Sequence, residues 1–211
     1  MFGGWATNEV MLTTGIAVFG HVFTEMFLQG LNHFHLKVKS GVLDQAMVRP
    51  RRILMQIACS EFEMNKIGRL IESIVLIVYG IINVDVVWTP YKAFVFIMML
   101  IGTNILFASL LILKGAFCFW TIEGMELMNI LQEGGRDLSS YPISIYKDWF
   151  AKLFTYIIPF GMCNYFPLMY LLDKEGAVWW YGLAPFATIP FLFAMLGLWK
   201  IGLRSYKSTG S

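Results

Sequence analysis

Two stretches of this chain, residues 93–113 and 153–172, contain no charged side chain. A helix needs about 20 predominantly apolar residues to cross the hydrocarbon core of a bilayer. Helices of soluble domains usually keep a polar face toward water and do not stay free of charge over such a length. The two stretches therefore predict transmembrane helices and exclude an ordinary soluble fold.

Two further segments repeat the pattern. Residues 179–199 form a third apolar run, and residues 71–89 form a fourth in which Asp85 lies near the far end. The composition agrees with a membrane protein, because 57% of the residues are hydrophobic and only 14% are charged. An average soluble domain carries about 25% charged residues.

The last apolar segment covers residues 10–31, where His21 and Glu25 interrupt the sequence. The rest of this segment is apolar on every helical face, whereas an interfacial helix would show a single polar stripe. We therefore count it as a span and expect five spans in all. The expected fold is all-α, a polytopic membrane helix bundle that forms one domain over residues 1–211.

The basic residues predict the orientation of this bundle, because lysine and arginine near a span are retained on the cytoplasmic side. With five spans, all but two of the sixteen basic residues fall on one side, and the two exceptions are Lys92 and Lys174. We expect a multi-pass protein of the cell membrane with its N-terminus outside and its C-terminus in the cytoplasm. Residues 32–70 and 114–152 would form two cytoplasmic loops.

The first cytoplasmic loop contains the sequence GVLDQAMVRP, residues 41–50, which predicts a short amphipathic helix ended by Pro50. One interpretation is an interfacial helix whose arginines bind membrane lipid head groups. The other is a docking helix that fits a groove on a soluble partner. Nucleic acid is not expected as a partner, because the basic cluster is short and lies in the inner loop of a membrane protein.

The second cytoplasmic loop predicts another helix, with apolar residues and several glutamates at helical spacing. This pattern is typical of a helix that lies along the membrane surface. The pair Gly134 and Gly135 is expected to end it. The following sequence SSYP, residues 139–142, is expected to break the chain before a further helix leads into the next span.

The sequence GVLDQAMVRP resembles the loop between the second and third spans of ABC-2 type permeases. Residues 119–150, the following YIIPFGMCNYFPLMYLL and the terminal YKSTGS are similar to a subfamily of small ABC-2 permeases that are encoded with a separate ATPase. Together these regions cover nearly the whole chain. The resemblance assigns the following residues to a coupling helix that rests on the ATPase: Gly41, Leu43, Asp44, Gln45, Arg49, Pro50 and Arg51.

The resemblance implies the permease subunit of an ATP-binding cassette exporter, which moves a hydrophobic or amphipathic compound (drug, lipid or peptide) out of the cell. A second permease subunit, identical or related, would pair with this chain, and a separate ATPase subunit would bind ATP and Mg²⁺. The chain has no phosphate-binding glycine loop, so we expect it to be no enzyme and to hold no cofactor. The family usually has six spans, which implies that its first span is missing from this sequence.

Strongly polar groups inside a span are costly and are often functional. His21 and Glu25 lie four residues apart in the first span, Asn104 lies in the third and Asn164 lies in the fourth. These residues could line a substrate path. They could instead form hydrogen bonds between helices of the bundle.

Two other functions stay open. A membrane enzyme that acts on lipid or peptide could use His21 and Glu25 as an acid and base pair. A non-transporting assembly subunit is the other alternative. No metal site is expected, because His33 and His35 point to different sides of a helix and no cysteine or acidic residue completes a ligand set beside them.

Overall fold

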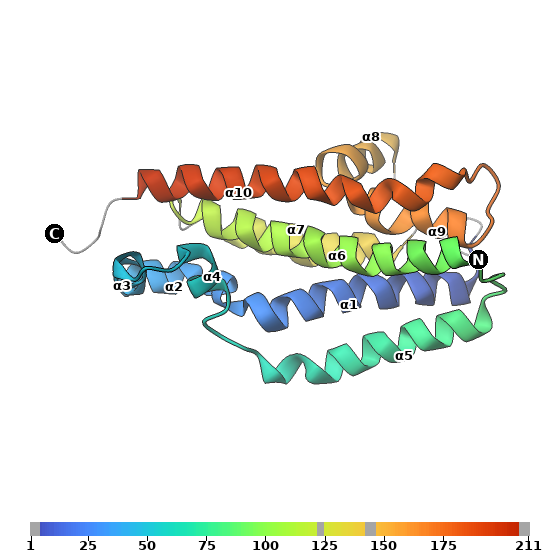
Figure 1. Cartoon of the computed structure of the whole chain (residues 1–211), viewed down its shortest axis with the longest axis horizontal. Coiled ribbons are helices and arrows are strands. Elements are labelled where there is room, and N and C mark those ends of the chain that lie inside the picture. The colour runs from blue at the N-terminus through green and yellow to red at the C-terminus, as the bar shows by residue number, and fades with distance from the viewer. Residues whose placement is uncertain (1–4, 122–124, 142–146, 207–211) are drawn as a thin grey trace.

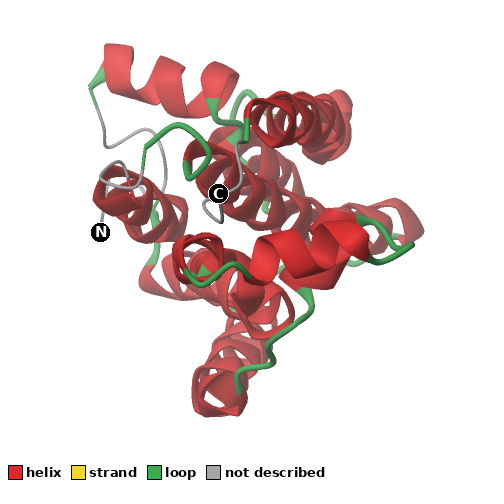
Figure 2. Cartoon of the chain, turned by 90° about the vertical axis from the view of Figure 1, so that its left-hand side faces the viewer, coloured by secondary structure: helices red, strands yellow, loops and turns green. Residues whose placement is uncertain are grey.

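The computed structural model describes residues 5–121, 125–141 and 147–206 of the chain. Within these ranges every regular element is a helix (Figure 2). The long helices run side by side along one axis and form an elongated bundle (Figure 1). The expected all-α architecture is therefore confirmed for the described part of the chain. The predicted break at SSYP falls partly outside it, because Pro142 is not among the described residues.

Three of the described helices are long and apolar enough to cross a membrane, judged by length and composition. They are α1 (Thr7–Asn32), which continues almost directly into α2 (Phe34–Lys39), then α6 (Pro90–Phe117), and finally α10 (Thr188–Ser205) with the preceding 3₁₀ helix η5 (Trp179–Ala187). Each coincides with one predicted span. The count of five spans stays a prediction, because the other two segments have different structures.

The segment predicted as a span at residues 71–89 forms α5 (Ile67–Asn83), a helix of 17 residues. It ends before the predicted boundary because Val84 is extended (φ −109°, ψ 129°) and begins a β-branched stretch with low helix propensity. α5 packs against α1. A side chain at Gly80 would lie 2.7 Å from Cβ of Leu12, so glycine permits the close contact between these helices.

The charge-free stretch at residues 153–172 is not one continuous helix. Four short helices follow one another in this region: α8 (Asp148–Lys152), the π-helices η3 (Leu153–Ile157) and η4 (Gly161–Tyr165), and α9 (Phe166–Leu171). The break lies at Ile158, which is extended (φ −115°, ψ 105°). Pro159 explains it, because proline lacks an N–H donor and forces the preceding residue out of the helical region.

The helix predicted in the second loop is α7 (Met125–Ser140), and its expected end at the glycine pair is wrong. The helix continues through Gly134 and Gly135 and packs against α1 and α6. A side chain at Gly135 would lie 2.3 Å from the ring of Phe160, so this glycine serves a close contact rather than a helix end. α7 therefore belongs to the bundle instead of lying apart from it.

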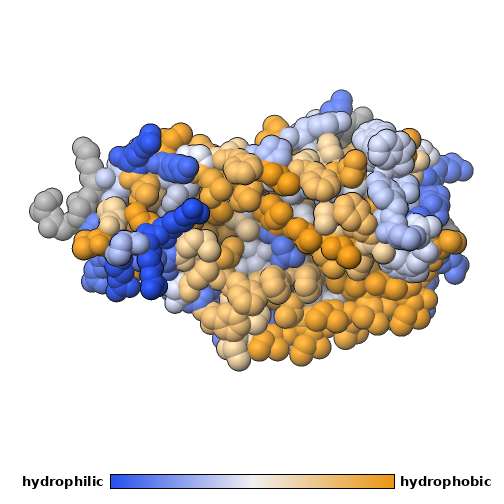
Figure 3. Space-filling view, in the orientation of Figure 1, coloured by the Kyte–Doolittle hydropathy of each residue, from blue (hydrophilic) through white to orange (hydrophobic). Residues whose placement is uncertain are grey.

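The bundle is arranged around α6, which contacts α1, α7 and α10. At one end, α2, α3 (Val42–Val48) and α4 (Ile53–Ala58) form a compact group (Figure 1). α1 begins at the opposite end, whereas α10 finishes at the same end as this group. Hydrophilic residues gather around α3 and α4, and hydrophobic residues cover much of the middle of the visible face (Figure 3).

Candidate functional site

We call the group of α2, α3 and α4 the platform. The turn between α2 and α3 lies at Gly41, whose φ of 71° is in the left-handed region that glycine adopts without steric cost. α3 stops at Arg49, which is extended because Pro50 follows it. The short helix and its proline end are thus confirmed, while the role of its residues stays a prediction.

The inner side of the platform is apolar and is anchored in the bundle. Leu43 of α3 is fully buried. It belongs to one cluster with Phe34 of α2, Ala116 of α6 and Trp199 of α10. The ring centroids of Phe34 and Trp199 are 5.1 Å apart. Because such a close-packed cluster has few voids to absorb a displacement, movement of α3 would pass to α6 and α10.

The outer side of α3 exposes apolar and basic groups together. Val48 is 87% exposed and Met47 is 40% exposed, which is unusual for side chains of this size. Among the residues predicted to couple, Leu43 points inward, and Gly41 and Asp44 are partly buried. The exposed ones are Gln45, Arg49, Pro50 and Arg51.

A hollow of about 710 Å³ adjoins this surface. Its lining consists of Arg49, Pro50, Arg51, Met55, Gln56, Cys59 and Ser60. Arginine and methionine are among the residues enriched at protein interfaces. The hollow therefore suits a partner that presents an apolar side chain beside acidic groups.

Ion pairs join the platform to the segment that leads into α5. Glu61 pairs with Lys37 of α2 at 2.8 Å and with Nδ1 of His33 at 2.7 Å. Burial alone would raise the pKa of Glu61, but the hydrogen bonds from Lys37 and His33 outweigh it and hold the pKa below its ordinary value. The ionised carboxylate thereby fixes this connecting segment to α2.

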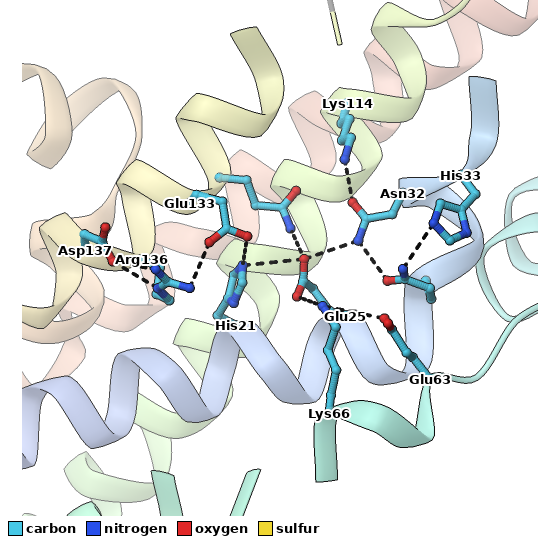
Figure 4. A network of polar contacts seen from close by, with 12 residues as sticks. His21, Glu25, Asn32, His33, Glu63, Lys66, Lys114, Glu133, Arg136 and Asp137 are labelled. Carbon is cyan, nitrogen blue, oxygen red and sulfur yellow. Dashed lines mark hydrogen bonds and ion pairs between the residues drawn. The ribbon is translucent and has the colours of Figure 1, made fainter. Parts of the chain in front are cut away.

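A second polar network lies inside the bundle and is centred on Glu25 of α1, which is only 5% exposed (Figure 4). Its Oε2 atom pairs with Lys66 of η1 (residues 64–66). Its Oε1 atom accepts hydrogen bonds from Gln132 of α7 at 2.7 Å and from Asn32 at 3.2 Å. Lys114 of α6 donates to Asn32 at 2.6 Å. One buried carboxylate therefore connects α1, η1 and α7, and Asn32 extends the network to α6.

His21 lies one turn before Glu25, is fully buried and faces the same network. Its Nε2 atom is 3.6 Å from Oε1 of Glu25 and 3.9 Å from Oε1 of Glu133. On α7, Arg136 pairs with both Glu133 and Asp137 at 2.8 Å. The expected pair of His21 and Glu25 is therefore present as a close contact rather than as a hydrogen bond.

The two asparagines singled out from the sequence form contacts between helices. The Thr24 hydroxyl of α1 donates to the backbone carbonyl of Asn104 at 3.2 Å. The Thr103 hydroxyl donates to Oδ1 of Asn164 at 3.0 Å, and Asn164 donates in turn to the Ser139 carbonyl of α7 at 3.5 Å. These contacts agree with the interhelical role that was the alternative to a substrate path.

A groove of about 520 Å³ opens between α5 and α7, with α1 as its floor. Its lining combines apolar and charged groups: Thr14, Val18, Val22, Arg69, Glu72, Arg136, Asp137, Ser140 and Tyr141. Such a lining matches a molecule that has both a polar and an apolar part.

Comparison with protein families decides what kind of protein carries these features. A family model described as ABC-2 family transporter protein matches residues 1–210. The chain belongs to the ABC-2 transporter family. Searches of curated proteins and of solved structures found no match. The resemblance seen in the sequence is thus confirmed, and membership identifies a membrane transport component rather than an enzyme.

In this ABC-2 permease, the partners of Glu25 could not be predicted from the sequence. Lys66 falls in the first predicted cytoplasmic loop, and Lys114 and Gln132 fall in the second. The sequence offers one indication of these contacts, a row of polar residues on one face of α7. That row is also typical of a helix on a membrane surface, so it did not indicate burial against α1.

The end of the ABC-2 permease opposite the platform holds the two basic residues that were exceptions to the charge distribution. Lys92 pairs with Asp173 at 2.6 Å, and Lys174 pairs with Glu9 at 2.7 Å. Each of these positive charges is therefore balanced by a carboxylate. Among the described residues, Arg49 and Arg51 of the platform form no ion pair with a carboxylate.

Proposed function

We propose that this chain is the membrane-spanning subunit of an ABC exporter and that a separate ATPase subunit docks on the platform. The ATPase subunit would bind ATP and Mg²⁺, and this chain would supply neither site. The observation that carries the proposal is the two-sided character of α3. Its Leu43 side is anchored in the bundle, while Met47, Val48 and Arg49 are exposed at one end of the molecule.

The contacts of the platform support a route for mechanical coupling. A displacement of α3 by the ATPase would move Leu43 and the cluster it shares with α6 and α10. The clamp formed by Glu61 and Lys37 would carry the same displacement to the start of α5. Because Glu25 connects η1, α1 and α7, these helices would then move together rather than one by one.

The groove between α5 and α7 supports a cargo that is hydrophobic or amphipathic, such as a drug, a lipid or a peptide. The outer face of α5 is apolar and exposed, at Ile71, Val75 and Ile82 among others. In a membrane this face contacts lipid or a second permease subunit, identical or related. In this proposal the platform lies in the cytoplasm, the chain starts outside, and cargo leaves the cell.

The platform assignment is tested by charge reversal on its exposed side. Arg49→Glu removes a cation from the proposed interface, and Asp85→Lys changes an exposed charge near the other end of the bundle. Both proteins are reconstituted with the ATPase subunit, and the bound ATPase and its rate of ATP hydrolysis are measured. We expect Arg49→Glu to weaken binding about tenfold, which corresponds to about 1.4 kcal/mol, and Asp85→Lys to leave it unchanged.

An unchanged affinity of the Arg49→Glu protein would remove the platform from the interface. If both variants bound the ATPase equally weakly, the defect would lie in assembly as a whole. That result would also contradict the assignment. A permease that binds the ATPase normally but never changes its rate of hydrolysis would favour the non-transporting assembly subunit.

A further inference from the structure

The imidazole of His21 has no hydrogen-bond partner on either ring nitrogen, although the side chain is fully buried. Buried polar groups in proteins are nearly always hydrogen-bonded, and an exception calls for a water, an ion or a functional reason. One edge of the ring contacts Phe107, with 5.0 Å between the ring centroids. The Nε2 atom points instead at two carboxylates (Figure 4).

The three side chains that meet there bring one nitrogen and two carboxylate groups close enough to ligate a single ion. Nε2 of His21 and the Oε1 atoms of Glu25 and Glu133 all lie within 4.8 Å of one another. Zinc binds nitrogen and oxygen at about 2.1 Å with tetrahedral angles, which places neighbouring ligand atoms about 3.4 Å apart. The observed separations of 3.6 Å and 3.9 Å from Nε2 need to close by only a few tenths of an ångström.

The second oxygen of each carboxylate is held by a cation. Oε2 of Glu25 pairs with Lys66, and Oε2 of Glu133 pairs with Arg136 at 2.8 Å. Each carboxylate therefore turns its Oε1 atom toward His21, and Oε1 of Glu25 also accepts the hydrogen bonds from Gln132 and Asn32. Metal-binding side chains are commonly oriented by such outer contacts, which are part of the binding site.

The charge around His21 also favours a cation. The network of Figure 4 contains four carboxylates and three cationic side chains; Lys66 and Arg136 pair with carboxylates, and Lys114 donates to Asn32. The carboxylates are those of Glu25, Glu63, Glu133 and Asp137, and the cations are Lys66, Lys114 and Arg136. With both His21 and His33 neutral, these labelled groups carry one excess negative charge. Glu133 is half exposed, so an ion can reach the cluster without unfolding of the bundle.

We propose that His21, Glu25 and Glu133 form a binding site for one divalent transition-metal ion of the Zn²⁺ type. Imidazole and carboxylate ligands suit Zn²⁺ and Co²⁺ better than Mg²⁺ or Ca²⁺, which prefer oxygen alone. The neutral His21 ring would bind through its Nε2 lone pair. The ion would link α7 to α1 and so stabilise the packing of α7 in the bundle. This site is independent of the proposed ATPase interface.

The site is tested by direct metal binding to the full-length chain, purified without a histidine tag and placed in lipid nanodiscs. Zn²⁺ is titrated by calorimetry, the bound metal is counted by mass spectrometry, and Co²⁺ is added to record its visible absorption. The chain has only three histidines, so His33→Gln and His35→Gln are matched controls for His21→Gln. Glu133→Gln provides a second test variant at a half-exposed position.

We expect one metal ion per chain in the wild type and in both control variants. His21→Gln and Glu133→Gln are each expected to lower the affinity by more than about 100-fold, because loss of a direct ligand exceeds the 10- to 100-fold cost of losing an outer contact. Absence of stoichiometric binding to the wild type would overturn the proposal. So would loss of binding in a control variant, or full binding by Glu133→Gln. If His21→Gln does not fold, the Glu133→Gln titration decides the outcome.

Discussion

At the scale of single residues, Glu25 joins several elements of the described chain. It is a buried carboxylate whose partners come from η1, α7 and the end of α1. Burying an ion is costly, and the cost is offset only when every oxygen has a partner. The contacts with Lys66, Gln132 and Asn32 meet that condition, and the contact with Gln132 links α7 to α1.

Replacement of Glu25 by glutamine is expected to destabilise the protein by about 3 kcal/mol, because it leaves Lys66 without its buried partner. Glu63→Gln is the matched control, since Glu63 contacts the same lysine at 3.6 Å from a more exposed position. Its cost should stay below about 1 kcal/mol. The unfolding midpoint of both variants in nanodiscs measures the difference. Equal midpoints would refute the central role of Glu25.

The Glu61 clamp predicts a dependence of stability on pH. Since the pKa of Glu61 is lower in the folded protein than its ordinary value of 4.5, the clamp contributes fully above that pH. The contribution is lost as the pH falls through the lowered folded pKa. Glu61→Gln should therefore melt at a lower temperature than the wild type at pH 7, by about 2–4 °C for a partly exposed pair. At pH values below the folded pKa, the wild type and Glu61→Gln should have the same melting temperature. A difference in melting temperature that stays constant with pH would contradict the prediction.

At the scale of elements, α7 shows the limit of prediction from the sequence. The apolar runs of α1, α6 and α10 could be predicted because each is a long helix whose own residues satisfy its backbone. Two polar residues of α7, Gln132 and Glu133, face side chains of α1 that lie more than 100 residues away, for example Glu25 for Gln132. Nothing local distinguishes such a face from one that meets water. The platform helix was predictable, since Gly41 and Pro50 mark both of its ends.

The two glycines of α7 should respond to alanine in opposite directions. A side chain at Gly135 would meet the buried ring of Phe160 at 2.3 Å, so Gly135→Ala is expected to cost about 1–3 kcal/mol. Gly134 has no atom within 4 Å of the added carbon. Gly134→Ala should therefore stabilise the helix by about 0.5–1 kcal/mol. The midpoint of thermal unfolding reports both, and a loss of stability in both variants would show that α7 is packed differently.

At the scale of the whole molecule, the two ends of the bundle differ in what they expose. The platform end presents Val48, Met47 and Arg49, whereas Lys92 and Lys174 at the other end are paired with carboxylates. This difference agrees with the uneven distribution of basic residues along the sequence, and it distinguishes the two ends of the bundle. An ABC-2 permease whose ATPase lies in the cytoplasm would place its platform there. The apolar runs alone did not predict the break at Pro159 or the early end of α5.

The proposed coupling is tested most directly by locating the ATPase on the molecule. A photo-crosslinking amino acid is placed at Gln45 on the exposed side of α3, or at Val87 near the opposite end, in the assembled transporter. After illumination, the crosslinked partner is identified by mass spectrometry. We predict that position 45 captures a chain with a nucleotide-binding phosphate loop and that position 87 does not. Capture of the ATPase at position 87 alone would contradict the proposed coupling through the platform.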